Sequence, residues 1–195
     1  MSSLFQPYAT MILTALTLAV LAQAWPAKPM APVTMVDAAG VTRQIPSKRT
    51  ATVLVFVATD CPIANRTAPE LSRIVKRYAS KSVDFFYVYA DSAPTNRQIQ
   101  SHLIEFNLGA PGIKDAKHLL VKAVGAMVTP EAAVLNSRGQ LLYRGRVNDL
   151  FVEHGVARKT AKTNDLRDAL DQILAGVPVK NRETPALGCS IPPLD

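Results

Sequence analysis

The stretch ATVLVFVATDCPIANRTAPELSRIVKRYA, residues 51–79, decides the fold. It begins with a continuous run of apolar and β-branched residues over 51–58, which is typical of a strand buried on both faces. The segment TDCP, residues 59–62, interrupts this run, and apolar residues then recur at helical spacing with basic residues between them. The stretch therefore predicts a buried strand, a short turn and an amphipathic helix.

Cys61 lies in this turn, immediately before Pro62. Proline suits the first position of a helix, where no backbone donor is required. A thiol at the start of a helix faces free N–H groups and the positive end of the helix dipole, which favour the thiolate and lower the thiol pKa. We therefore interpret Cys61 as a redox-active cysteine. The alternative is a buried, inert cysteine.

The composition indicates one globular domain. The chain has 195 residues, of which 48% are hydrophobic and 19% charged, so it can bury a core of its own. The formal net charge is +7, but the basic residues are scattered along the chain and form no dense run. This pattern is typical of a solvated basic surface, and we expect no nucleic-acid partner.

Residues 1–24 predict a signal peptide. The segment 9–22 is uncharged and rich in Leu, Ala and Thr, but it is too short to span a bilayer comfortably. Ala22-Gln23-Ala24 follows as a small-x-small cleavage site, so we expect an exported, periplasmic protein that begins at Trp25. No Lys or Arg precedes the apolar segment, which leaves an uncleaved membrane anchor as the alternative and as the one route to membrane association.

Strand and helix patterns alternate through the rest of the chain, after a linker at 25–31. The predicted elements are a hairpin at 33–36 and 41–45, a buried strand at 83–90, a helix from 95 to about 106, a loop at 108–115, a helical segment at 116–124, an antiparallel hairpin at 127–135 and 141–147, an irregular segment at 148–163, a helix from 164 or 165 to 174, and a proline-rich tail at 177–195. This order implies an α/β fold with a mixed central sheet flanked by helices.

Three segments carry a resemblance to a known family. FVATDCPIANRTAPEL, VTPEAAVLNSRGQLLYRGRVND and GCSIP resemble the bacterial redoxin-domain proteins grouped with the alkyl hydroperoxide reductase and thiol-specific antioxidant family, within the thioredoxin superfamily. The resemblance covers roughly residues 32–192, with a thioredoxin-like domain at 32–176 and the tail at 177–195. It implies a cis peptide bond between Thr129 and Pro130, with the proline packed beside Cys61, and a supporting role for Thr59 and Pro62.

The sequence also departs from the patterns of related groups. Thioredoxins carry a second cysteine where this chain has Ala64, so a Cys-x-x-Cys dithiol is excluded. Typical peroxiredoxins carry Thr or Ser where this chain has Ala58, which argues against a peroxidase. Copper chaperones of the superfamily use a cysteine where this chain has Asn65, and the three histidines lack metal-ligand spacing. We expect no metal and no cofactor.

The chemistry that the resemblance implies is that of an oxidoreductase acting on disulfides or peroxides. Attack by the Cys61 thiolate gives a mixed disulfide or a sulfenic acid, and another thiol resolves either product. Cys189 is the only other cysteine, so it is the candidate resolving thiol, and a thiol electron donor is the expected partner. Asp60 opposes thiolate formation, Arg66 is a candidate to offset it, and Thr59 is a candidate helix cap.

Two other functions remain open from the sequence. In the first, the protein is a non-catalytic exported domain, and a structural disulfide between Cys61 and Cys189 contributes about 4–5 kcal/mol to its stability. In the second, the chain is a thiol- or metal-binding module.

Overall fold

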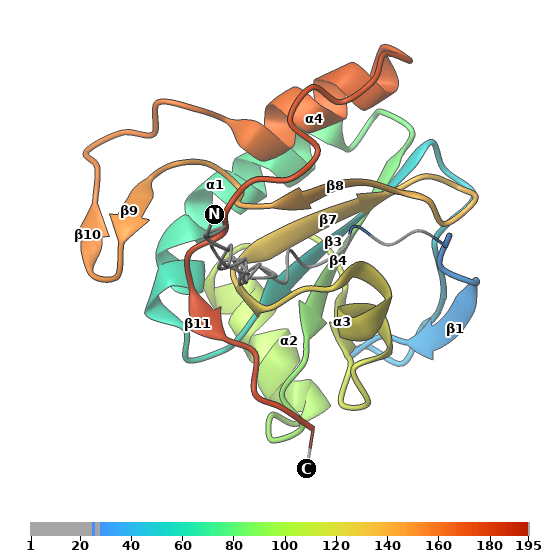
Figure 1. Cartoon of the computed structure of the whole chain (residues 1–195). Helices are drawn as coiled ribbons and strands as arrows, with labels where there is room; N and C mark the ends of the chain where they lie inside the picture. The colour runs from blue at the N-terminus through green and yellow to red at the C-terminus, as the bar shows by residue number, and fades with distance from the viewer. Residues whose placement is uncertain (1–24, 26–27, 195) are drawn as a thin grey trace, which may run out of the picture.

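The computed structural model describes residue 25 and residues 28–194 (Figure 1). The predicted signal peptide, residues 1–24, lies outside the described residues. Within them, no helix is both long and apolar enough to cross a bilayer.

The centre of the fold is a five-stranded mixed sheet. Its order is β5-β4-β3-β7-β8, formed by β3 (Ala51–Val57), β4 (Val83–Tyr89), β5 (Gly112–Lys114), β7 (Glu131–Leu135) and β8 (Leu141–Gly145). β3 and β5 run parallel to β4, whereas β7 runs antiparallel to both β3 and β8. The sheet confirms the mixed α/β architecture predicted from the sequence.

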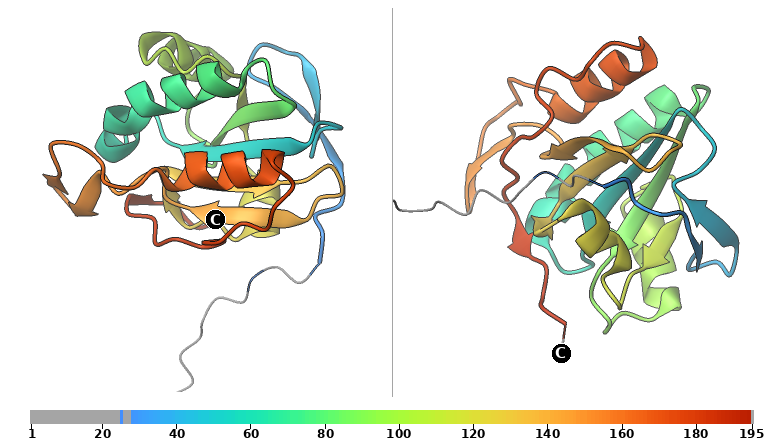
Figure 2. Two further views of the ribbon diagram at one scale, coloured as in Figure 1. Left: turned by 90° about the horizontal axis from the view of Figure 1, so that it is seen from above. Right: turned by 45° about the vertical axis from the view of Figure 1, so that its right-hand side comes forward.

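Each face of the sheet has its own core because side chains alternate along the strands. All seven residues of β3 are buried: Val53, Val55 and Val57 face one core, while Leu54 and Phe56 face the other. The first core contains side chains of α1 (Pro62–Tyr78), α2 (Asn96–Glu105) and α4 (Asp165–Leu174). The second contains side chains of α3 (Leu119–Val124) and of the predicted N-terminal hairpin, β1 (Val33–Val36) and β2 (Thr42–Ile45). Figure 2 shows α1 and α2 together on one side of the sheet.

Local chemistry sets where the helices begin. α1 begins at Pro62, as predicted. The Thr95 hydroxyl caps α2 by accepting the backbone N–H of Gln98. The side-chain oxygen of Gln98 in turn accepts the backbone N–H of Thr95, which completes a capping box. α3 begins later than predicted, at Leu119, because the buried carboxylate of Asp115 accepts the first three N–H groups of the helix.

Three segments differ from the sequence-based expectations. The predicted loop at 108–115 contains the edge strand β5, which pairs with β4. The predicted strand at 127–135 is divided at Pro130 into β6 (Val128–Thr129) and β7, because proline has no N–H to continue a ladder. The segment 148–163 is not irregular throughout, since it holds an antiparallel pair, β9 (Phe151–Glu153) and β10 (Val156–Ala157).

The C-terminal tail is bound to the domain along its length. It first follows β8, where the N–H of Arg144 donates to the carbonyl of Arg182 at 2.9 Å and the N–H of Thr184 donates to the carbonyl of Arg144 at 3.1 Å. It then forms β11 (Cys189–Ser190), which pairs antiparallel with β6. Figure 1 shows this red segment passing from α4 to the opposite end of the molecule. The tail thereby brings Cys189 to the end of the sheet where Cys61 lies.

Candidate active site

The Cys61 turn lies where two parallel strands end. Val57 is the register partner of Tyr89, so the chain leaves β3 and β4 at the same edge of the sheet. Cys61 itself is the N-cap residue of α1, with extended backbone (φ −80°, ψ 108°), and its sulfur accepts the N–H of Ala64 at 3.5 Å. The suggestion that Thr59 caps the helix is therefore wrong, because the cysteine sulfur takes that role.

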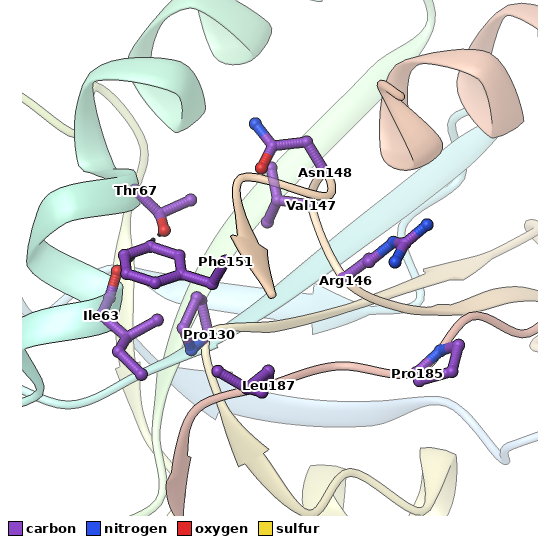
Figure 3. A pocket seen from close by; sticks show the side chains of 9 residues that line it. All are labelled: Ile63, Thr67, Pro130, Arg146, Val147, Asn148, Phe151, Pro185 and Leu187. Carbon is purple, nitrogen blue, oxygen red and sulfur yellow. Dashed lines mark hydrogen bonds between the residues drawn. The ribbon is translucent and has the colours of Figure 1, made fainter. Parts of the chain in front are cut away.

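Thr129 lies directly against Cys61, and Pro130 follows it in the chain. The Cys61 thiol donates to the carbonyl oxygen of Thr129 at 3.0 Å, and the Thr129–Pro130 peptide bond is cis, as expected. Figure 3 shows the Pro130 ring among side chains from three other segments, including Ile63 of α1 and Leu187 of the tail. The cavity between them is only about 20 Å³, room for about one water molecule, so the ring is closely packed.

Cys189 reaches the same place from the other end of the sequence. In the β6–β11 pair, Cys189 lies opposite Thr129, and the Thr129 hydroxyl donates to the Cys189 carbonyl at 3.4 Å. The N–H of Ile191 donates to the carbonyl of Met127 at 2.9 Å and holds the far end of the pair. The two cysteines are not bonded to each other.

Gly188 makes this approach possible. A Cβ atom at this position would lie 2.1 Å from the carbonyl oxygen of Thr129 and 2.5 Å from its carbonyl carbon. Both contacts are to backbone, which no side-chain rotation can relieve. Glycine is thus the residue that lets the tail approach β6 closely enough to bring Cys189 into register.

The surroundings of the two thiols shift their pKa values in opposite directions. Burial raises the pKa of Cys61, but hydrogen bonds that its sulfur accepts from Cys189, from the Thr129 side chain and from the Ala64 N–H outweigh it, so the pKa lies below the ordinary value. Burial, followed by the hydrogen bond and charge of Cys61 and the charge of Asp60, raises the pKa of Cys189 to about 11. The Arg66 guanidinium lies 5.8 Å from the centre of the Phe151 ring, and Arg66 is not among the groups that shift either thiol pKa. At neutral pH, Cys61 is therefore the better nucleophile of the two.

A pocket of about 290 Å³ opens onto both cysteines. Its lining residues come from the ends of β3 and β4, from the Cys61 turn, and from β6 and the tail: Val57, Ala58, Asp60, Cys61, Ala90, Asp91, Thr129, Cys189, Ser190, Ile191 and Pro192. The pocket gives a small thiol or disulfide a path to the sulfurs. In the part of the chain that the structure describes, no group of three or more His, Cys, Asp or Glu side chains is placed to hold a metal ion.

A buried hydrogen-bonded chain anchors the turn before Cys61. The amide nitrogen of Asn65 donates to the Thr59 carbonyl at 3.1 Å, and its amide oxygen lies 2.8 Å from Nε2 of His102. Nδ1 of His102 lies 2.8 Å from the hydroxyl of Tyr89. Burial lowers the pKa of His102, so the ring is neutral at pH 7 and donates from Nε2 while Nδ1 accepts the tyrosine proton.

Sequence reasoning considered His102 only as a metal ligand and missed this role. The sequence contained a signal for this role. His102 shares a helical face with the apolar residues Ile99 and Phe106, and this spacing predicts that its side chain faces the core. Asp91 was also missed as a residue of the site. It could have been found, because it follows a buried strand, and the carboxyl ends of parallel strands lie at one edge of the sheet, where Cys61 also lies.

Comparisons with known proteins agree with this geometry. The Redoxin family model matches residues 31–158. A hypothetical protein from Sinorhizobium meliloti has a similar structure (TM-score 0.72, 25% identity, 84% of this chain and 91% of that chain covered). An uncharacterized conserved protein from Geobacillus kaustophilus is equally similar (TM-score 0.72, 26% identity, 84% and 89% covered).

A more distant likeness concerns the fold alone. The solved structure is that of a secreted disulfide oxidoreductase from Mycobacterium tuberculosis, with a TM-score of 0.52, 20% identity, and coverage of 74% of this chain and 96% of that chain. A search of curated proteins gave no match. Together, these findings describe a fold like that of thiol–disulfide oxidoreductases, with two cysteines near each other.

Proposed function

The chain belongs to the Redoxin family, and from this premise we propose that it is a thiol–disulfide oxidoreductase with Cys61 as its nucleophile and Cys189 as its resolving cysteine. One observation carries the proposal. β11 holds Cys189 opposite Thr129, the residue whose carbonyl accepts the Cys61 thiol. This arrangement pairs a thiol of lowered pKa with a second thiol held beside it.

The reaction proceeds in two exchange steps. The Cys61 thiolate attacks one sulfur of a substrate disulfide, so that a bond forms to Cys61, the substrate S–S bond breaks, and the first substrate thiolate leaves with the electron pair and takes a proton from water. Cys189 then loses its proton and attacks the Cys61 sulfur, which forms the Cys61–Cys189 disulfide and releases the second substrate thiol. The protein gives up two electrons, and an external thiol donor returns them.

The surrounding residues position the nucleophile. Pro62 starts α1 without an N–H of its own, and the Ala64 N–H is left to bond the Cys61 sulfur. The Thr129 carbonyl accepts a hydrogen bond from the Cys61 thiol, and Pro130 packs near Ile63 at the start of α1. The Thr59 carbonyl is tied to Asn65, which fixes the turn from the other side.

Disulfide exchange is favoured over peroxide reduction by the lining of the pocket. Cleavage of a peroxide expels an oxygen anion, which is far more basic than the thiolate that leaves in disulfide exchange and therefore needs a positive or hydrogen-bonding group nearby more strongly. Among the described residues that line the pocket there is no Lys, Arg or His. Its hydroxyls are those of Thr129, which donates to the Cys189 carbonyl, and of Ser190, and Ala58 adds none beside Cys61. Asp60 and Asp91 would oppose the developing charge.

We place this reaction outside the cytoplasm, in the periplasm, because residues 1–24 have the pattern of a signal peptide. N-terminal sequencing of the protein from its native host should begin at Trp25 or within a few residues of it. An intact Met1 in a soluble cytoplasmic fraction would contradict export.

The catalytic roles are tested with two serine variants. Cys61→Ser should abolish reduction of 2-hydroxyethyl disulfide, while Cys189→Ser should allow one stoichiometric turnover and retain a mixed disulfide on Cys61 that mass spectrometry detects. The matched control is Ser137→Ala, on an exposed turn, which should turn over like the parent protein.

A redox titration separates catalysis from the structural alternative. Catalytic disulfides have potentials above about −300 mV, whereas structural ones lie below it. A potential below that value, together with full turnover by Cys61→Ser, would overturn the proposed function.

A further inference from the structure

The pocket beside the two cysteines carries two carboxylates. Asp60 is exposed in the Cys61 turn, and Asp91 is half-buried in the segment that follows β4. One oxygen of Asp91 accepts the N–H of Ala93 at 2.8 Å. Among the ion pairs of the described residues, none involves Asp60 or Asp91. Both charges therefore act on whatever enters the pocket.

This local charge is opposite to that of the whole protein. The formal net charge is +7, yet the charged side chains lining the described pocket are both acidic. Much of the remaining lining is apolar, including Val57, Ile191 and Pro192. A low-dielectric wall next to unpaired carboxylates strengthens their field inside the pocket.

We propose that this site selects disulfides and thiols that carry positive charge next to the sulfur. The inference rests on the proposed function and specifies its substrate class. At about 290 Å³, the pocket suits a short cationic chain attached to one sulfur, such as an aminoethyl group or a cysteine beside a basic residue. The positive group then lies near Asp60 or Asp91 while the sulfur reaches Cys61.

Cystamine illustrates the reaction. The Cys61 thiolate forms a bond to one cystamine sulfur, the cystamine S–S bond breaks, and 2-aminoethanethiolate leaves with the electron pair and is protonated by water. Cys189 releases the second 2-aminoethanethiol as the protein disulfide forms. The ammonium group stays intact throughout and serves only in recognition.

The expected preference follows from Coulomb's law. A unit charge about 6 Å from a carboxylate in a water-like dielectric gains enough energy to change a rate about threefold. Two carboxylates give about tenfold in favour of a cation, and an anionic disulfide is slowed to a similar extent. The preference should fade at about 1 M salt, where the Debye length falls to about 3 Å.

The test compares three disulfides of different charge as oxidants of the reduced full chain: dicationic cystamine, neutral 2-hydroxyethyl disulfide and anionic oxidised glutathione. At low salt, the second-order rate constants should fall in that order. Asp60→Asn and Asp91→Asn should each lower the cystamine-to-neutral rate ratio about threefold, and the double variant should bring it close to the ratio that a free small thiolate gives with the same two disulfides. Because the readout is a ratio, a general change in Cys61 reactivity cancels.

The matched control is Asp168→Asn, which removes the same charge from the exposed surface of α4 and should leave the ratio unchanged. A second arm compares disulfides of the peptides Lys-Cys-Lys and Glu-Cys-Glu. Oxidation by the basic peptide faster than by cystamine would identify a protein segment as the source of the cation, and the reverse would identify a small aminothiol.

Three results would overturn the inference. Equal rates with all three disulfides would remove the charge preference while leaving the proposed function intact. A preference that survives in the double variant would assign it to other groups. No reaction with any disulfide, in protein whose Cys61 is still alkylated by iodoacetamide, would overturn the proposed function and the inference with it.

Discussion

The two cysteines meet from regions of the molecule that are built in different ways. Cys61 follows β3, in which every residue is buried, and caps the 17-residue helix α1. Cys189 belongs to the two-residue strand β11, which is held by its pairing with β6 and by the close approach at Gly188. The position of Cys61 therefore depends on the global core, whereas the position of Cys189 depends on a few contacts that can change without unfolding the domain.

The largest expected effect is on the region that holds Cys61. Leu54 of β3 is fully buried, so Leu54→Ala should lower the free energy of unfolding by about 3 kcal/mol through lost burial and a residual cavity. The thiol pH profile of the remaining folded protein should not change. Urea unfolding measures the first quantity and iodoacetamide kinetics the second.

The control for this variant is Val177→Ala, since Val177 is 50% exposed and its truncation should change stability by less than about 0.5 kcal/mol. If Leu54→Ala also shifted the pH profile, the chemistry of Cys61 would depend on more than the core beneath it.

The next effect is on the region that holds Cys189. Gly188→Ala places a methyl group against the Thr129 backbone, so β11 should leave its register with β6. Closure of the Cys61–Cys189 disulfide should slow at least about tenfold, equivalent to about 1.4 kcal/mol, while the free energy of unfolding should fall less than in Leu54→Ala. The lifetime of the mixed disulfide on Cys61, followed by mass spectrometry, measures the closure rate.

Gly155→Ala is the matched control for the glycine. Gly155 has a positive φ of 79° and open space around it, so alanine there should lower stability but leave disulfide closure unchanged. Normal closure in Gly188→Ala would show that the approach at Thr129 does not set the position of Cys189.

The smallest effect concerns the acidity of the pair. The alkylation rate of Cys61 should inflect below the ordinary thiol value near 8.5, because hydrogen bonds stabilise its thiolate despite burial. Cys189→Ala removes one of those bonds, so the inflection should move to higher pH and the thiolate fraction at pH 7 should fall. An inflection that stays in place would mean that Cys189 contributes nothing to the acidity of Cys61.

The sequence predicted the parts of the fold that have a strong local signal. The continuous apolar run of β3 and the proline at the start of α1 defined the strand–turn–helix unit directly. β5 has three residues and β9 has three, which is too short for a periodic pattern to be detected. Their strand conformation depends on a neighbouring strand, which the local sequence does not contain.

The candidate site likewise combines residues that the sequence predicted with a residue that it could not predict. Cys61, Cys189, Thr129 and Pro130 were named from short motifs, and the structure brings them together. The need for Gly188 could not be predicted, because it arises where two segments distant in sequence approach each other. Such a contact is a property of the assembled chain.

The order of these regions in the sequence also has a consequence for synthesis. All five strands of the central sheet and all of α1–α4 precede Cys189. Because a chain grows from its N-terminus at about 5–20 residues per second, these elements are synthesised before the second thiol exists. A nascent chain therefore carries Cys61 as a reactive thiol without an internal partner, and during that interval it is open to exchange with any disulfide that it meets.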